Sequence, residues 1–299
     1  MSLTSRRAMR SGTSSIVSLI IPDIRNDFYS TASKAIADCC QERGQLVLAV
    51  TNDDPALELE HLRNLRSARA LGFIIIPSIA PSQEMLRLMR STPHVQFVRR
   101  CSKVESDWFG IDDALAMRLA VRHLVELGHR RIAYIGSTTA ISTGRDRLDG
   151  FCQAFLAAGL TVEEQLLHAG SCETEFGFSA TTQLLDVPAP PTAIVSAGAR
   201  IGTGAYDCAR QRGVSIPEQL SFVGFSESLN LRWRGGGVTT ITLPIPELAT
   251  ASTDFLFRKA APDWRADSPA CHAMLQPNLM VRGSTAIPNV PAARDPLPA

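Results

Sequence analysis

The strongest constraint on the fold of this chain is an alternation, along most of its length, of short apolar runs with longer amphipathic segments of helical period. Ile16–Ile21 opens the series, and the next segment carries its apolar residues on one helical stripe up to Gly44. Asp54 and Pro55 supply an N-cap and a first-turn proline for the following helix. Strands that alternate with helices form parallel sheets with helices on both faces, so the sequence predicts an α/β protein.

The same pattern continues towards the C-terminus. Beyond the first strand, we predict strands over 47–50, 73–76, 95–98, 132–135, 193–196 and 222–224. A helix is expected from about Asp113 to Leu127, before Gly128. The run 239–242, which follows a glycine-rich segment, is expected to be a return crossing of the chain.

Length and charge limit the classes of function. The 299 residues suit about two domains, each large enough for its own core. Thirty Lys and Arg balance 29 Asp and Glu, which gives a formal net charge of +1. The chain as given therefore has no global field that would hold nucleic acid or an anionic membrane.

Cysteine usage and hydropathy indicate a cytoplasmic protein. The seven cysteines form an odd number and include no C-x-x-C pair, which fits a reducing compartment. Arginines precede the apolar run 16–21 as in a signal peptide, but the run is short and meets Pro22 rather than a cleavage site. No apolar stretch approaches the ~20 residues that span a bilayer, so we expect no membrane role.

Motifs for catalysis, metals and cofactors are missing. The six histidines are scattered, and no metal-ligand spacing occurs. Gly202-Thr203-Gly204 lacks the third glycine of a dinucleotide loop, and the segment 224–228 lacks the last glycine of a nucleophile elbow. We expect no metal, no cofactor and no enzymatic activity, and binding is favoured by elimination.

Five segments, in order, carry a resemblance to a known family. They are Ile21-Pro22-Asp23-Ile24 with Asn26 and Phe28-Tyr29, then 127–136 (LGHRRIAYIG), 191–194 (PTAI), 213–225 (GVSIPEQLSFVGF) and 279–285 (LMVRGST). Together they resemble the effector-binding region of the lactose-repressor (LacI/GalR) family of bacterial transcription regulators. The resemblance covers roughly residues 14 to 287.

The resemblance implies a fold of the type I periplasmic-binding-protein kind. Two Rossmann-like lobes, each a parallel sheet flanked by helices, would be joined by three crossovers with a ligand in the cleft between them. The first lobe would take 14–112 and 239–268, and the second 113–238 and 269–288. Residues 1–13 are expected to be a tag or hinge remnant, and 289–299 a disordered tail.

Partners follow from the same resemblance. Members of the family bind a small-molecule effector, form homodimers, and contact operator DNA through an N-terminal helix-turn-helix. That DNA-reading part is not found in this chain, which we expect to be a truncated regulator. Effector binding would favour one lobe orientation and so change operator affinity.

Ligand-binding residues in the family map onto several positions here. Arg147, with Thr143 before it, matches the arginine that opens a helix of the second lobe, where its planar fork can hold a carboxylate or a hydroxyl pair. Phe28 and Tyr29 are expected to stack on a ligand face or to pack in the core. Asp23 and Asn26 would supply polar contacts, although Asp23 can equally cap the following turn, and Ser226 and Glu227 complete the expected set.

Departures from the family pattern suggest the class of effector. Arg99 and Arg100 follow a strand where many relatives carry an acidic residue, and Ala199 and Arg200 follow another where Asn-Asp is usual. Cys172 replaces a frequent aromatic residue. The sequence therefore predicts an anionic effector, such as a sugar acid or phosphosugar, unless these arginines point to solvent or pair with carboxylates such as Asp112, Glu173 or Glu227.

Two other functions remain open on the sequence alone. A solute-binding protein of a sugar transport system would have the same fold and cleft, but the signal peptide is missing and the cysteines are odd in number. An enzyme that acts on sugar acids or nucleosides would need a general acid and base, and no such constellation is present.

Overall fold

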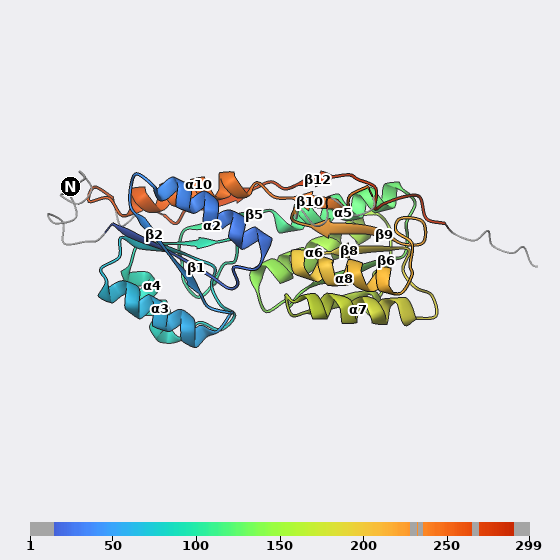
Figure 1. Ribbon diagram of the computed structural model, residues 1–299, viewed down its shortest axis with the longest axis horizontal. Helices are drawn as coiled ribbons and strands as arrows, with labels where there is room; N and C mark the ends of the chain where they lie inside the picture. The colour runs from blue at the N-terminus through green and yellow to red at the C-terminus, as the bar shows by residue number, and fades with distance from the viewer. Residues whose placement is uncertain (1–14, 228–231, 233–235, 265–268, 290–299) are drawn as a thin grey trace, which may run out of the picture. The chain divides into compact units, whose positions relative to one another are not determined.

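Two six-stranded sheets form the framework of the protein, as the computed structural model shows for residues 15–227, 232, 236–264 and 269–289. The first contains, in spatial order, β11 (His272–Leu275), β5 (Trp108–Ile111), β4 (His94–Phe97), β3 (Gly72–Ile75), β1 (Ile16–Ile21) and β2 (Gln45–Val50). The second contains β12 (Asn278–Met280), β10 (Thr239–Thr242), β9 (Ser221–Phe225), β8 (Ala193–Ser196), β6 (Ile132–Ser137) and β7 (Leu167–Gly170). Only β12 is antiparallel to its neighbour, so the predicted parallel α/β class is confirmed (Figure 1).

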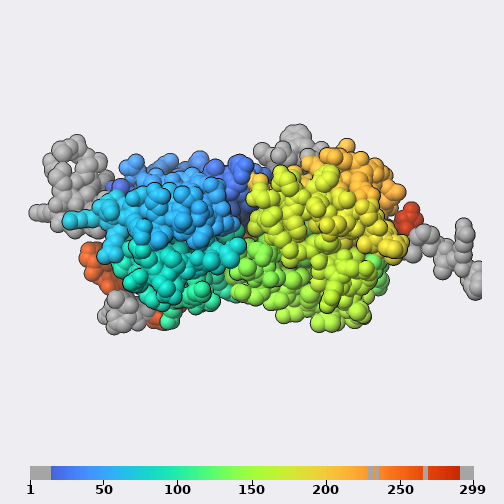
Figure 2. All heavy atoms as spheres, turned by 90° about the horizontal axis from the view of Figure 1, so that it is seen from below, coloured from blue at the N-terminus to red at the C-terminus, as the bar shows by residue number. Residues whose placement is uncertain are grey.

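Helices cover both faces of the first sheet (Figure 1). α2 (Asp27–Cys40) and α10 (Ile245–Lys259) pack on one face, where their apolar residues join strand residues in a single core. α3 (Pro55–Ser67) and α4 (Gln83–Ser91) pack on the other face, and Figure 2 views the molecule from their side. As the sequence predicts, Asp54 caps α3, because its Oδ1 accepts the Ala56 N–H at 2.8 Å.

The second sheet is covered in the same way. α7 (Thr174–Asp186) and α8 (Ala199–Gln211) pack on one face and share a core with it. The short helix η1 (Glu164–Leu166) precedes β7 along the chain. α6 (Ser142–Ala157) packs on the other, where Phe151 lies 5.2 Å from the Tyr134 ring of β6. α5 (Asp113–Glu126) buries the residues expected on its apolar stripe, Met117, Ala120, Val121 and Leu124.

Contacts between α7 and α8 are made backbone to backbone. A Cβ added at Gly204 would lie 1.9 Å from the Thr174 carbonyl oxygen, and one at Gly177 would lie 2.0 Å from the Ile201 carbonyl oxygen. Each helix therefore needs glycine where the other approaches it.

The chain divides into two compact units and passes between the two sheets three times. One unit comprises the chain up to Leu115 with Thr138–Asp146 and Leu243–Pro277, and the other comprises Ala116–Ser137, Arg147–Thr242 and the chain from Asn278. The predictions for residues 1–13 and for nearly all of 289–299 lie outside the described residues.

Two strands lie in the opposite sheet from the one expected. The run 239–242 was expected in the first lobe as a crossing, but it pairs in parallel with β9 and extends the second sheet before the chain crosses. The segment 272–275 was expected in the second lobe, but it pairs in parallel with β5. Backbone pairing at a free sheet edge decides both placements, because the segment 239–242 satisfies hydrogen bonds of β9 and the segment 272–275 satisfies those of β5.

Candidate functional site

Polar residues gather just beyond the carboxyl ends of the strands in both sheets. In a parallel sheet these ends share one edge, and ligands of open α/β proteins bind there. In the first unit this edge carries Asp23 after β1, Asp53 after β2 and Arg99 after β4. In the second it carries Gly198 after β8 and Ser226 after β9.

The loop after β1 uses its polar residues for local structure. Asp23 accepts from the Arg25 backbone N–H at 3.0 Å and from the Arg25 guanidinium, with Nη2 to Oδ2 at 2.8 Å. Asn26 caps α2, because its Oδ1 accepts the Phe28 N–H at 3.0 Å. Phe28 is buried in the core of the first unit, and Tyr29 packs edge-on against it at 5.5 Å. Their roles as ligand contacts stay predictions.

A strained turn directs Arg99 inward. Val98 has a φ of +62°, which is rare for a β-branched residue, and the Arg99 N–H donates to the Phe97 carbonyl at 2.7 Å. The Trp108 indole holds the turn by donating from Nε1 to the Val98 carbonyl at 2.9 Å. The Arg99 guanidinium is buried and forms an ion pair with Asp53.

A buried carboxyl group lies beside this ion pair. Glu58 of α3 has no exposed surface, and its Oε2 accepts the Ser78 N–H at 2.8 Å. Burial raises the pKa of Glu58 to about 7, the hydrogen bond from Ser78 opposes that rise, and the nearby Asp53 charge adds to it. Glu58 was not among the residues predicted from the sequence.

Arg100 forms hydrogen bonds with the N-terminal part of α6. Its N–H donates to Ser142 Oγ at 2.9 Å, and its Nη2 donates to Asp146 Oδ2 at 2.8 Å. Its guanidinium also lies over the Trp108 ring, 4.9 Å from the centroid. Thr143, in the same part of α6, is buried.

Arg147 reaches the carboxyl ends of β8 and β9. Its Nη1 donates to the Ala197 carbonyl at 2.9 Å, and its guanidinium lies 3.9 Å from the centroid of the Phe225 ring. A hydrogen bond and a stacked aromatic face fix the plane of this guanidinium, which is the arrangement needed for bidentate recognition.

The loop after β8 begins a helix. Gly198 is the N-cap of α8 and Ala199 its first residue, and no side chain caps this end. Arg200, in the same first turn, forms an ion pair with Glu173, one of the carboxylates considered in the sequence analysis. Cys172 precedes Glu173 between β7 and α7 and is half-buried.

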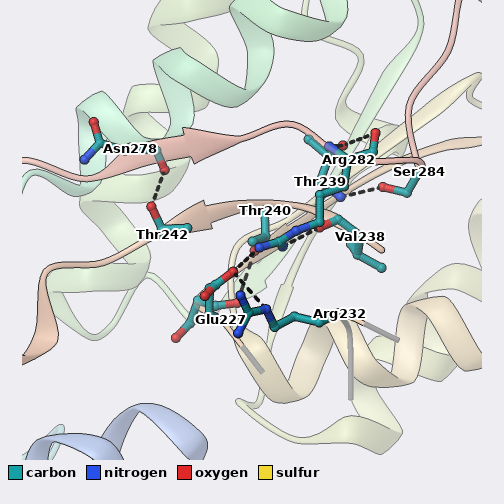
Figure 3. A network of polar contacts seen from close by, with 10 residues as sticks. Glu227, Arg232, Val238, Thr239, Thr240, Thr242, Asn278, Arg282 and Ser284 are labelled. Atoms are coloured by element: carbon teal, nitrogen blue, oxygen red, sulfur yellow. Dashed lines mark hydrogen bonds and ion pairs between the residues drawn. The ribbon is translucent and has the colours of Figure 1, made fainter. Parts of the chain in front are cut away.

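Ser226 and Glu227 follow β9. Ser226 is buried and has a φ of +66°. The Glu227 carboxylate forms an ion pair with the Arg282 guanidinium, and the Arg232 Nε lies 4.0 Å from the same carboxylate (Figure 3). Arg282 is in turn held by the Val238 carbonyl, to which its Nη1 donates at 3.0 Å.

Ion pairing compensates much of the positive charge that the sequence predicts. Carboxylates pair with predicted arginines in Arg99–Asp53, Arg100–Asp146 and Arg200–Glu173. Asp53 and Asp146 were not among the residues predicted from the sequence. The run Asn52-Asp53-Asp54 before a proline was the available signal for Asp53, because Asn and Asp tolerate the left-handed backbone that residues 52 and 53 adopt.

Over the described part of the chain, no three His, Cys, Asp or Glu side chains come close enough together to hold a metal ion. None of the helices described is sufficiently long and apolar to traverse a bilayer.

The two mostly parallel sheets and the three passages between them define an α/β fold of the periplasmic-binding-protein type. The transcription regulator CcpA of Lactococcus lactis has the same fold, with a TM-score of 0.82 at 20% identity over 91% of this chain and 99% of that one. The chain belongs to the family described as periplasmic binding proteins and sugar binding domain of LacI family, whose pattern matches residues 14–255.

Two regulators are similar over nearly the whole chain. The HTH-type transcriptional regulator DegA of Bacillus subtilis is 30% identical over 287 residues, which are 93% of this chain and 83% of that protein. The HTH-type transcriptional regulator GalR of Escherichia coli is 26% identical over 289 residues, which are 96% of this chain and 83% of that protein. The resemblance to the LacI/GalR family drawn from five sequence segments is thereby confirmed.

Proposed function

We propose that this chain is the effector-sensing and dimerisation part of a LacI-family transcription regulator, not an enzyme. A small metabolite binds in the cleft that the family resemblance implies and changes the affinity of the regulator for its operator DNA. Arg147 carries the proposal. The Ala197 carbonyl and the Phe225 ring hold its guanidinium at the carboxyl edge of the second sheet, where a ligand of this fold is expected.

The proposed effector is anionic, of the sugar-acid or phosphosugar kind. Arg147 offers a planar fork that matches a carboxylate or phosphoryl group. Because Arg99, Arg100 and Arg200 are ion-paired within the protein, an effector gains from them only by replacing a carboxylate.

Homodimerisation is part of the same proposal. β2 forms an edge of the first sheet, and Val47 and Leu48 on it are 37% and 40% exposed. Edge strands with exposed apolar side chains favour association with a second copy. The effector acts by its different affinities for two dimer conformations, and a tenfold change in operator affinity requires about 1.4 kcal/mol of coupling.

A cytoplasmic location agrees with the thiols. Burial raises the pKa of Cys40 to about 11, which keeps it a thiol at neutral pH. A periplasmic solute-binding protein would share the fold, but free cysteines are rarer in an oxidising compartment.

A thermal-shift screen that compares the unchanged chain with its Arg147→Ala variant tests the proposal. We expect sugar acids or phosphosugars to raise the Tm of the full chain, because a ligand at a hundredfold excess over Kd adds about 2.7 kcal/mol. Arg147→Ala should abolish the shift, since charge-assisted hydrogen bonds contribute about 1.5 to 3 kcal/mol each.

Arg122→Ala is the matched control, because Arg122 is exposed on α5 with only a long contact of 3.7 Å to Glu126. It should keep the ligand-induced shift. An effector bound equally well by the Arg147→Ala protein would contradict the proposed role of Arg147. Conversion of the ligand to a product would contradict a purely regulatory function.

A further inference from the structure

Three central strands of the second sheet end in one row. Ile135 of β6 pairs with Ser196 of β8, and Val195 of β8 pairs with Val223 of β9. Continuing this register past the strand ends places Ser137, Gly198 and Ser226 side by side. The Ala197 N–H still donates to the Ile135 carbonyl at 2.8 Å, so the β6–β8 pairing extends to this row.

The two serines of this row have buried hydroxyl groups without partners. Ser137 is 3% exposed and Ser226 is 2% exposed, and among the described residues neither Oγ makes a hydrogen bond. Ser196, just before the row, differs, because its Oγ donates to the Gly198 carbonyl at 3.0 Å. A buried polar group without a partner destabilises the protein unless a ligand or a water satisfies it.

The N-terminus of α8 lies in the same row. Gly198 is its N-cap and has no side chain to satisfy the first N–H groups, and the first bond within the helix runs from Gly202 N to Gly198 O at 2.8 Å. Helix geometry leaves the N–H groups of Ala199 and Ile201 without partners in the helix. The N-terminus of this 13-residue helix also carries partial positive charge.

Ser137 lies on the sheet face that α8 covers. Ala133 and Ile135, which precede it at intervals of two, pack in one core with Ile201 and Ala205 of α8. Alternation along the strand puts Ser137 on that face. Neighbouring strands are about 4.8 Å apart, so the two serines stand roughly 9 to 10 Å apart with the helix N-terminus between them.

Arg147 brings a guanidinium to the row. It donates to the carbonyl of Ala197, the residue before Gly198. Arg200, in the first turn of α8, pairs with Glu173, so its positive charge adds little there. Hydroxyl donors, a helix N-terminus and a guanidinium are the groups that bind oxyanions in proteins.

We propose that Ser137, Ser226 and the N-terminus of α8 form an oxyanion subsite that takes the phosphate or carboxylate group of the effector. This inference rests on the proposed function and assigns the charged end of the effector to one end of one helix. Ser137 is a ligand-binding residue on this view, although nothing in the sequence analysis singled it out.

The subsite is tested by the direction of two changes in serine variants, one in the ligand-free Tm and one in the affinity for phosphate. Ser137→Ala and Ser226→Ala, separately and together, are compared with the unchanged chain for Tm without ligand and for binding of inorganic phosphate, glucose 6-phosphate and glucose by calorimetry. We expect each variant to keep or raise the ligand-free Tm, because an unsatisfied hydroxyl is removed. Each should bind phosphate and glucose 6-phosphate about five- to tenfold more weakly, with glucose unaffected.

Ser18→Ala is the control, because Ser18 is a fully buried strand serine of the first sheet whose Oγ donates to the Val47 carbonyl at 3.0 Å. It should lower the Tm and leave phosphate binding unchanged. A fall in Tm with no loss of phosphate affinity in the Ser137 and Ser226 variants would overturn the subsite, as would a full-length chain that phosphate neither stabilises nor binds.

The subsite and the proposed function can fail separately. If a neutral sugar binds through Arg147 and the serine variants bind it normally, with no preference for anions, the subsite and the anionic class of effector are wrong, and the effector-sensing function stands. If phosphate binds at the serines but no metabolite competes for that position, the subsite stands and the proposed function is contradicted.

Discussion

Gly204→Ala is expected to destabilise the protein by about 2 to 3 kcal/mol, although alanine is the better helix former. The new methyl group would lie 1.9 Å from the Thr174 carbonyl oxygen and 2.9 Å from the Phe178 nitrogen, both backbone atoms of α7. Because a helix backbone cannot rotate away, α7 and α8 must separate and expose part of their shared core. Urea unfolding followed by circular dichroism measures the loss.

Gly202→Ala, on the same helix, is the matched control for that result. Its Cβ would meet the Ser196 hydroxyl oxygen at 2.8 Å, and a serine side chain can change rotamer. The gain in helix propensity then offsets most of the cost, so the loss should stay below about 1 kcal/mol. Equal stability of the two variants would show that the approach of α7 to Gly204 does not limit packing.

Glu58→Gln is expected to stabilise the protein at pH 8 by roughly 3 kcal/mol and to have little effect at pH 4.5. Burial raises the pKa of Glu58 from 4.5 to about 7, so the folded state keeps a proton that the unfolded state has released. The contribution of Glu58 is therefore fully favourable below about pH 4.5 and is lost as the pH rises through 7. Glutamine keeps an oxygen that can accept the Ser78 N–H and never ionises.

Unfolding free energies of the two proteins at pH 4.5, 6, 7 and 8 provide the measurement. The difference between them isolates Glu58, because every other titratable group contributes equally to the unfolding free energy of both proteins. His94 is one such group, since burial lowers its pKa to about 4 and its neutral form favours the folded state as the pH rises from 4 to 6.5. Glu84→Gln is the control, because Glu84 pairs with Arg63 on the surface and its pKa is lowered instead. A constant difference across the range would mean that Glu58 is not a neutral buried acid.

The sequence predicted most of the central strands but not β5, and of the four edge strands it predicted only β2. β1 and β8 have the predicted bounds, because their residues are mostly apolar and almost all buried. β7, β11 and β12 are edge strands with half-exposed residues, and each has a shorter apolar run or none. Their pairing depends on a neighbouring strand that lies far away along the chain, which local periodicity does not report.

Predictions about the candidate site were limited for a related reason. The strand pattern placed Arg99 after a strand, and the family resemblance placed Arg147 near the start of a helix. The sequence did not predict which carboxylates pair with the arginines, since Asp53 lies 46 residues before Arg99 and reaches it only in the folded sheet. Serines without partners are equally invisible in sequence, because their burial and missing bonds exist only in three dimensions.

The late arrival of the last two strands affects how a newly made chain folds. β11 completes the edge of one sheet next to β5, and β12 completes the edge of the other next to β10, yet both follow all the other described strands along the chain. During synthesis, β5 and β10 therefore keep open hydrogen-bonding edges until residues 272–280 have been made. A ribosome that stalls before residue 272 would leave both sheets able to pair with other nascent chains.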